Sequence, residues 1–173
     1  GSDTVPGCYE DLELADLVVL VGSNLAWCHP VLYQRLTAAR AQRGTKVIVI
    51  DPRETASCEI ADQHLAIRPG ADVALFNGLF AHLAAAGRLD WSYIGAHTSG
   101  LDGALAAASL ASPAEIAVTT GLSEAAVRNF YEAYAATERV VTVYSQGVNQ
   151  SSAGTDKVNA ILNCHLATGR IGK

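Results

Sequence analysis

The stretch Leu17-Val18-Val19-Leu20-Val21, followed directly by Gly22-Ser23-Asn24, decides how this chain folds. A second apolar stretch, residues 47–50, leads into Asp51-Pro52-Arg53. Unbroken runs of Val, Ile and Leu are typical of parallel strands that are covered on both faces, whereas a half-exposed strand alternates apolar and polar residues. Ligands of such sheets bind just beyond the carboxyl ends of the strands. The two polar turns therefore make a nucleotide-bearing molecule the first candidate ligand.

The segments around these strands predict an α/β fold, a Rossmann-like three-layer sandwich with a mainly parallel sheet. His29-Pro30 opens a helix that ends at Gly44, which completes a βαβ unit from about Leu17 to Ile50. Further strands are expected at residues 65–67 and 139–144, with helices starting near residues 73, 113 and 124. The last helix is expected to bury one apolar face, made of Val158, Ile161, Leu162 and Leu166. No linker or repeat interrupts the chain, so we expect residues 1–173 to form a single domain.

Composition excludes several classes of partner. The formal net charge is -5 and the Lys and Arg residues are scattered, so we expect no nucleic-acid partner, because such binding depends on clustered cations. No apolar run approaches the roughly 20 residues of a membrane span. The sequence contains no methionine, not even at position 1, and we expect the chain to be a piece of a longer protein.

The cysteines lie far apart and lack the spacing of metal ligands; they are Cys8, Cys28, Cys58 and Cys164. We interpret them as structural thiols in a reducing compartment, and we expect the protein to be cytoplasmic. No metal site is predicted from these residues.

The strand-end turns supply the candidate binding residues, and each has a simpler structural alternative. Gly22-Ser23-Asn24 can offer backbone N–H groups to a phosphate, or can be a tight turn in which Asn24 caps a helix. Asp51 can accept hydrogen bonds from ribose hydroxyls, or can cap a turn. Asp72 can bond a guanine edge, or can cap the helix after it. Arg53 and Arg68 are either phosphate ligands or surface cations.

No catalytic constellation is present in the sequence. The motifs G-x-S-x-G, the P-loop and H-E-x-x-H are all absent, and so is the G-x-G-x-x-G fingerprint of an ordinary NAD domain. The five histidines are dispersed, and a lone histidine is more often structural than catalytic. The sequence therefore predicts a binding site without a reaction centre.

Taken together, these motifs resemble the molybdopterin oxidoreductases that bind bis-molybdopterin guanine dinucleotide. The resemblance runs from about Pro6 to the last residue. It is carried by segments 22–24 with 29–30, 51–53, 60–62 with 68–72, and 147–150 with 168–173. Within that family, segments 6–11 and 22–30 are most similar to the catalytic subunit of bacterial assimilatory nitrate reductase, and Asp51-Pro52-Arg53 is shared with formate dehydrogenases.

The resemblance implies a role for each residue along the strand ends. For the phosphate and pterin side of one guanine dinucleotide it implies Gly22, Ser23, Asn24 and His29. For the ribose and phosphates it implies Asp51 and Arg53, and for the guanine it implies Gly70 and Asp72. Gly147 and Gln150 are implied on the pterin side.

The resemblance also implies that part of the enzyme lies outside these residues. The family's iron-sulfur cysteines, molybdenum-ligating cysteine and carboxyl-terminal cofactor domain are absent here, so molybdenum and the cluster would belong to the full-length enzyme. There molybdenum would reduce nitrate to nitrite, with electrons from a donor protein or subunit, and these residues alone would be inactive. Two alternatives stay open, a formate dehydrogenase and a cofactor-free scaffold such as the large iron-sulfur subunit of respiratory complex I. Asp51 together with Asp72 favours cofactor binding.

Overall fold

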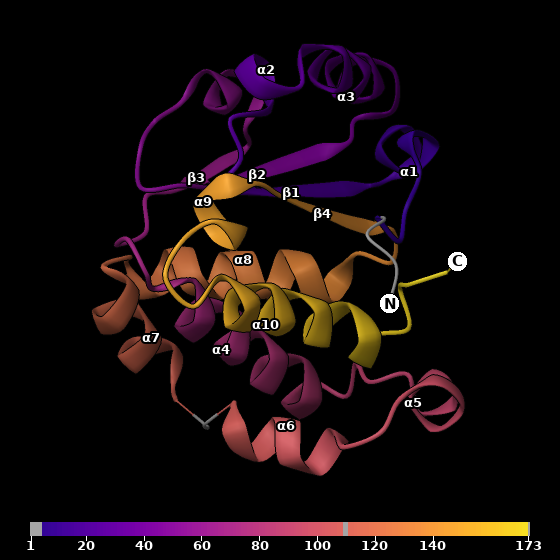
Figure 1. Ribbon diagram of the computed structural model, residues 1–173, viewed down its shortest axis with the longest axis vertical. Coiled ribbons are helices and arrows are strands. Elements are labelled where there is room, and N and C mark those ends of the chain that lie inside the picture. Colours follow the sequence, from indigo (N-terminus) through magenta and orange to yellow (C-terminus); the bar gives the residue numbers. More distant parts are fainter. Residues whose placement is uncertain (1–4, 109–110, 173) are drawn as a thin grey trace.

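The computed structural model describes residues 5–108 and 111–172. Within them, a four-stranded, all-parallel sheet has the strand order β3-β2-β1-β4 (Figure 1). The strands are β1 (Leu17–Val21), β2 (Lys46–Ile50), β3 (Gln63–Leu65) and β4 (Val140–Tyr144). Every residue of β1 is buried, because β1 lies between two neighbours in the sheet and has helices on both faces. The predicted α/β fold with a parallel sheet is confirmed.

Helices cover both faces of the sheet. On one face lie α2 (Leu25–Cys28) and α3 (Pro30–Arg43), and on the other α4 (Asp72–Ala85), α8 (Glu124–Ala136) and α10 (Gly154–Ala167) (Figure 1). The remaining helical segments are α1 (Tyr9–Leu14), the 3-10 helix η1 (Ala56–Ile60), α5 (Trp91–His97), α6 (Leu101–Ala107), α7 (Pro113–Thr120) and α9 (Gln146–Asn149). Within the described ranges, no helix has both the length and the apolar character that crossing a membrane requires.

The core is divided in two by the sheet. Val19 and Ile48 belong to a buried cluster on the α4, α8 and α10 side, and Val18 and Val49 belong to a cluster on the α3 side. This division follows from strand geometry, because successive side chains of a strand point to opposite faces. The unbroken apolar runs of β1 and β2 thus contribute side chains to both clusters.

Two expectations from the sequence were wrong in detail. The third strand spans Gln63–Leu65 and not residues 65–67, because the Ile67 N–H turns back to the Leu65 carbonyl oxygen at 2.9 Å and leaves the sheet. The buried face of α10 also differs from the predicted one. Ile161 is buried as expected, but Val158, Leu162 and Leu166 are half-buried, and the other buried positions include Lys157, Ala160, Cys164 and His165. Small residues on this face let α10 approach α4, where the Cys164 thiol lies 3.4 Å from the Phe76 carbonyl oxygen.

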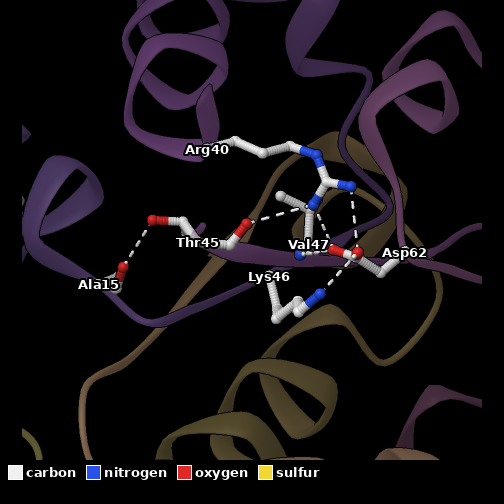
Figure 2. Close-up of polar contacts among 6 residues, drawn as sticks. All are labelled: Ala15, Arg40, Thr45, Lys46, Val47 and Asp62. Atoms are coloured by element: carbon white, nitrogen blue, oxygen red, sulfur yellow. Dashed lines mark hydrogen bonds and ion pairs between the residues drawn. The ribbon is translucent and has the colours of Figure 1, made fainter. Parts of the chain in front are cut away.

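Paired charges lie at the edge of the sheet where β2 begins. Figure 2 shows the amino-edge cluster, which consists of Arg40, Lys46, Val47 and Asp62. Asp62 accepts hydrogen bonds from the Arg40 guanidinium and, at 2.8 Å, from the Val47 N–H, and Lys46 Nζ lies 3.4 Å from it. Burial opposes ionisation of this carboxyl, but the hydrogen bonds from Arg40 and Val47 outweigh it and lower the pKa of Asp62. Next to the cluster, Thr45 donates a hydrogen bond to the Ala15 carbonyl oxygen (Figure 2).

Candidate functional site

The predicted site residues all follow the four strands and gather at the carboxyl edge of the sheet. In strand order, segments 68–72, 51–53, 22–29 and 145–150 come after β3, β2, β1 and β4. The short helix α9 follows β4 at this edge, and α2 follows β1 on the α3 side of the sheet (Figure 1). Because the strands are parallel, their turns meet at one edge even though the residues are far apart in sequence.

The strand order changes direction between β1 and β4. After β1 the chain passes through α3 to β2 on one side, and after β4 it passes into α10 on the opposite face of the sheet (Figure 1). The two loops that leave β1 and β4 therefore run to opposite faces of the sheet at this point. In open α/β sheets such a switch point is where ligands bind.

Two glycines meet at the switch point. The Gly147 N–H donates a hydrogen bond to the Gly22 carbonyl oxygen at 3.1 Å. A Cβ atom on Gly147 would lie 2.7 Å from Gly22 Cα, and one on Gly22 would lie 2.9 Å from Gly147 Cα. Gly22 also has a φ of +53°, in the left-handed region that favours glycine. Both positions therefore require glycine, and the two predicted site residues form a floor made of backbone atoms only.

Polar side chains of the β1 turn are held by residues that the sequence did not single out. The Ser23 hydroxyl lies 2.9 Å from the Ser145 hydroxyl, which joins the turns after β1 and β4. Asn24 Oδ1 accepts a hydrogen bond from the buried Ser57 hydroxyl at 3.2 Å. Asn24 stands at the amino-terminal cap position of α2 but its side chain makes no capping bond. Its amide nitrogen donates no hydrogen bond to the part of the chain that the structure describes, and it is available to a ligand.

Asp51 is fixed in position but keeps half of its carboxylate uncommitted. Its Oδ1 accepts a hydrogen bond from the Arg53 N–H at 2.8 Å, so the predicted turn cap is formed. A His64 ring nitrogen lies 2.9 Å from the Asp51 carbonyl oxygen. Asp51 Oδ2 has no hydrogen-bond partner among residues 5–108 and 111–172. The Arg53 side chain is 80% exposed, with its Nε 3.9 Å from Asp51 Oδ1, and extends into solvent.

Asp72 lies at the start of α4 and pairs with a lysine. The cap residue of α4 is Ala71, which makes no side-chain cap, so Asp72 is the first residue within the helix. Its Oδ2 lies 3.0 Å from Lys157 Nζ, and both residues are buried. Lys157 Nζ also donates a hydrogen bond to the Ser151 hydroxyl at 2.7 Å. This Asp72 cluster, consisting of Asp72, Ser151 and Lys157, connects the loop after β3 with the loop after β4.

The arginine that precedes this turn has a structural role. Arg68 Nη1 donates a hydrogen bond to the Val118 carbonyl oxygen at 2.9 Å, and the Arg68 N–H bonds the Thr120 carbonyl oxygen at 2.8 Å. Both acceptors lie in the last turn of α7, where helical carbonyl groups lack partners and a cation is favourable. Of the two arginines considered as phosphate ligands, Arg53 is therefore the better placed.

The other predicted residues stand apart from these contacts. His29, Gly70 and Gln150 are exposed, and within the described residues no side-chain hydrogen bond joins them to the rest of the predicted set. Gly70 has a φ of +87°, which explains glycine in the turn after Pro69. The structure thus brings Gly22 against Gly147 and Arg53 against Asp51, and leaves His29, Gly70 and Gln150 open to solvent.

Sequence reasoning missed Ser57, Ser145 and Lys157 at this edge. No motif marks Ser57, which comes from η1, a segment of only a few residues. Lys157 did leave a signal, because it falls in register with Ala160, Ile161 and Cys164 on the buried face of α10. A lysine on an apolar helical stripe needs a buried partner, and that requirement could have identified it.

A shallow hollow of about 410 Å³ lies at the opposite edge, lined by Thr37, Arg40, Ala41, Gly44, Lys46, Glu59 and Ile60. Arg40 and Lys46, which line it, are bound to Asp62 of the amino-edge cluster. Both of these cations are therefore already paired with a carboxylate of the protein. Among the described residues, no group of three or more His, Cys, Asp or Glu side chains is arranged to hold a metal ion.

Comparisons with known proteins match the whole chain. A family model described as Molybdopterin oxidoreductase matches residues 4–173. A nitrate reductase of Shewanella frigidimarina is 50% identical over 175 residues, covering 100% of this chain and 19% of the relative. The alpha subunit of an F420-dependent formate dehydrogenase of Methanocaldococcus jannaschii is 32% identical over 173 residues, covering 100% of this chain and 26% of the relative.

A solved structure shares the fold. Acetylene hydratase from Pelobacter acetylenicus aligns with a TM-score of 0.82 and 23% sequence identity, covering 91% of this chain and 22% of that chain. The chain spans about a fifth to a quarter of the length of the proteins it matches.

Proposed function

The chain belongs to the molybdopterin oxidoreductase family, and on that premise we propose that residues 1–173 form a cofactor-binding domain of a molybdenum-dependent nitrate reductase. The family implies a molybdopterin cofactor, and we propose its guanine dinucleotide form, bis-molybdopterin guanine dinucleotide. Nitrate is preferred as the substrate because the nitrate reductase relative is 50% identical and the formate dehydrogenase relative 32%. Formate remains the alternative substrate.

We propose that the rest of the enzyme supplies what this domain does not. The partners would be further domains of the same protein, which carry the molybdenum ligand and an iron-sulfur cluster, and an electron-donor protein. The enzyme would be cytoplasmic. These residues would not turn over nitrate by themselves, because the molybdenum ligand and the iron-sulfur cluster would belong to the other domains.

The observation that carries the proposal is the contact between Gly22 and Gly147 at the switch point of the sheet. With no side chain on either residue, the loops after β1 and β4 approach each other closely at the switch point, which is where ligands of such sheets bind. Around this floor the described residues keep unused hydrogen-bonding groups, namely Asp51 Oδ2, the Asn24 amide nitrogen and the exposed Arg53 guanidinium. Such a set fits a ligand that carries hydroxyl groups and phosphates.

The residues would divide the cofactor between them. Asp51 would accept hydrogen bonds from ribose hydroxyls, and Arg53 would contact phosphate. Asp72 with Gly70 would hold the guanine, and the loops of Gly22 and Gly147 would lie along the pterin side, together with Ser23, Asn24, His29 and Gln150. When bound, the cofactor would supply the molybdenum centre at which nitrate is reduced to nitrite by transfer of an oxygen atom and two electrons. This chain's own contribution would be to bind and orient it.

Calorimetric titration with GDP, which stands in for the guanine nucleotide half of the cofactor, tests the proposal. We expect weak, saturable binding that is lost in Asp51→Ala and in Asp72→Ala. The matched control is Asp102→Ala, which removes an exposed carboxylate from α6. Circular dichroism and a thermal melt establish that each variant is folded. A folded protein that does not bind GDP would favour the cofactor-free scaffold.

A further inference from the structure

Lys157 is a buried charge to which the sequence analysis assigned no role. It lies on α10 with 5% of its surface exposed, and it faces α4 and not solvent. A buried ammonium group is costly unless it is paired and hydrogen-bonded. Lys157 meets this requirement with Asp72 Oδ2 at 3.0 Å and the Ser151 hydroxyl at 2.7 Å.

The contacts of Lys157 form a chain that crosses the proposed site. The Ser151 hydroxyl donates in turn to the Val148 carbonyl oxygen at 2.6 Å, directly after the Gly147 loop. From Val148 through Ser151 and Lys157, the chain of polar contacts reaches Asp72 at the start of α4. The position of the Asp72 carboxylate is therefore set from the loop after β4, and not only by its own helix.

Lys157 occupies one carboxylate oxygen and leaves the other. Asp72 Oδ1 makes no hydrogen bond to any residue that the structure describes, and the Asp72 side chain keeps 11% of its surface exposed. A guanine presents two neighbouring donors, N1–H and the N2 amino group, and both suit a carboxylate. A carboxylate that is already oriented loses less conformational entropy when it binds such a ligand.

We propose that Lys157 is a positioning residue for guanine recognition, one that anchors Asp72 so that its free oxygen faces the N–H edge of the base. This inference rests on the proposed function, since it takes Asp72 as the guanine contact. Lys157 would act through Asp72 and would not itself touch the base. Ser151 would support it by fixing the ammonium group.

The alternative is that the Asp72 cluster only ties α10 to α4. Both roles would lower stability when Lys157 is replaced, so stability alone cannot separate them. Base selectivity can, because IDP has the same phosphates and ribose as GDP but lacks the N2 amino group. A structural tie would weaken GDP and IDP equally, whereas a positioning role would weaken GDP more.

The test measures GDP and IDP affinity by calorimetry for the wild-type chain, Lys157→Met, Lys157→Arg, Asp72→Ala and the double variant Asp72→Ala with Lys157→Met. We expect Lys157→Met to lose about tenfold in GDP affinity, the effect of about one charge-assisted hydrogen bond, with a smaller loss for IDP. Lys157→Arg should keep most of the selectivity because it keeps the cation. In the Asp72→Ala background, removing Lys157 should neither restore GDP binding nor lower any residual affinity.

The outcomes separate this inference from the proposed function. If the wild-type chain binds GDP, Asp72→Ala loses binding and Lys157→Met keeps both affinity and selectivity, the positioning role is wrong and the proposed function stands. If the folded wild-type chain binds neither nucleotide, the proposed function fails and the inference fails with it. Should Lys157→Met not fold, Ser151→Ala replaces it, because that variant keeps the ion pair and loosens only its anchor. If folded Ser151→Ala then prefers GDP over IDP by the same factor as the wild-type chain, the positioning role of Lys157 is wrong.

Discussion

The two edges of the sheet use polar residues in opposite ways. At the amino edge, Asp62 is bound by Arg40, Lys46 and the Val47 N–H. At the carboxyl edge, one carboxylate oxygen of Asp51 accepts a hydrogen bond within its own turn, and the other has no partner among the described residues. Charges that are satisfied by the protein stabilise the fold, and charges that are left partly unsatisfied can bind a ligand. This contrast favours the carboxyl edge as the proposed binding edge, without reference to any motif.

The glycines follow the same division. Gly44 ends α3 near the amino edge, and a Cβ atom there would meet nothing within 4 Å. Gly22 and Gly147 touch each other at the carboxyl edge, where a Cβ atom would overlap backbone. Glycine therefore serves a turn at one edge and a close approach of two loops at the other.

The largest effect is expected from filling the glycine contact. Gly147→Ala would place a methyl group 2.7 Å from Gly22 Cα and 2.8 Å from its carbonyl oxygen, so the backbone must shift. We expect a loss of about 3 kcal/mol in the free energy of unfolding. Gly95→Ala is the matched control, because a Cβ atom on that α5 residue meets nothing within 4 Å. Equal unfolding midpoints in urea for the two variants would contradict the close contact.

A pH dependence is expected from the buried His165 of α10, whose Nε2 lies 2.8 Å from the Thr142 hydroxyl of β4. Burial, together with the nearby Arg170 charge, lowers the pKa of His165 from 6.5 to about 4. Between pH 6.5 and pH 4 the unfolded chain binds more protons at His165 than the folded chain does. The contribution of the neutral His165 to stability is therefore fully present above pH 6.5 and is lost as the pH falls toward 4. We expect a loss of about 3 kcal/mol over that range.

Urea unfolding at pH 7 and pH 4.5 measures this dependence. His165→Gln should remove most of the difference between the two pH values, because the new side chain does not titrate. His97→Gln, at an exposed histidine of α5, is the control and should leave the difference unchanged. A wild-type chain that is equally stable at both pH values would refute the assignment.

A smaller effect is expected from opening the amino-edge cluster. Asp62→Ala removes the acceptor for Arg40 and for the Val47 N–H, and should cost about 2 kcal/mol of stability. Because the pKa of Asp62 is lowered in the folded state, its contribution is present above the unfolded pKa of about 4 and is lost as the pH falls further. GDP affinity of the folded variant should match that of the wild type. A marked loss of GDP binding in a fully folded Asp62→Ala would show that the two edges are not independent.

The smallest effect on stability is expected at the carboxyl edge itself. The Arg53 side chain is 80% exposed, so Arg53→Ala should change the free energy of unfolding by less than about 0.5 kcal/mol. If Arg53 contacts phosphate, GDP affinity should fall about threefold, as expected for one exposed ion pair. The loss should diminish in high salt, because salt screens exposed charges. Calorimetry at two salt concentrations measures both effects, and salt-independent binding would remove Arg53 from the site.

Much of the fold could be predicted from residues 17–21 and 47–50, because strands that are buried on both faces are apolar throughout. The capping box of Ser112 and Glu115 likewise placed the start of α7, since its two hydrogen bonds are local. The third strand and the buried face of α10 were predicted less well. Both depend on which partner a short segment meets, and local sequence does not contain that information.

By itself, the sequence determined the parallel α/β architecture and predicted the carboxyl edge of the sheet as the ligand-binding edge, because strand burial and turn chemistry depend on local sequence. Only the tertiary structure decided that Gly22 meets Gly147, that Ser57 holds Asn24 and that Lys157 pairs with Asp72. These contacts join residues from different loops, and their energies depend on distances that arise only after the chain has folded. For the same reason, a lysine on an apolar helical stripe becomes meaningful only once the carboxylate that it faces is known.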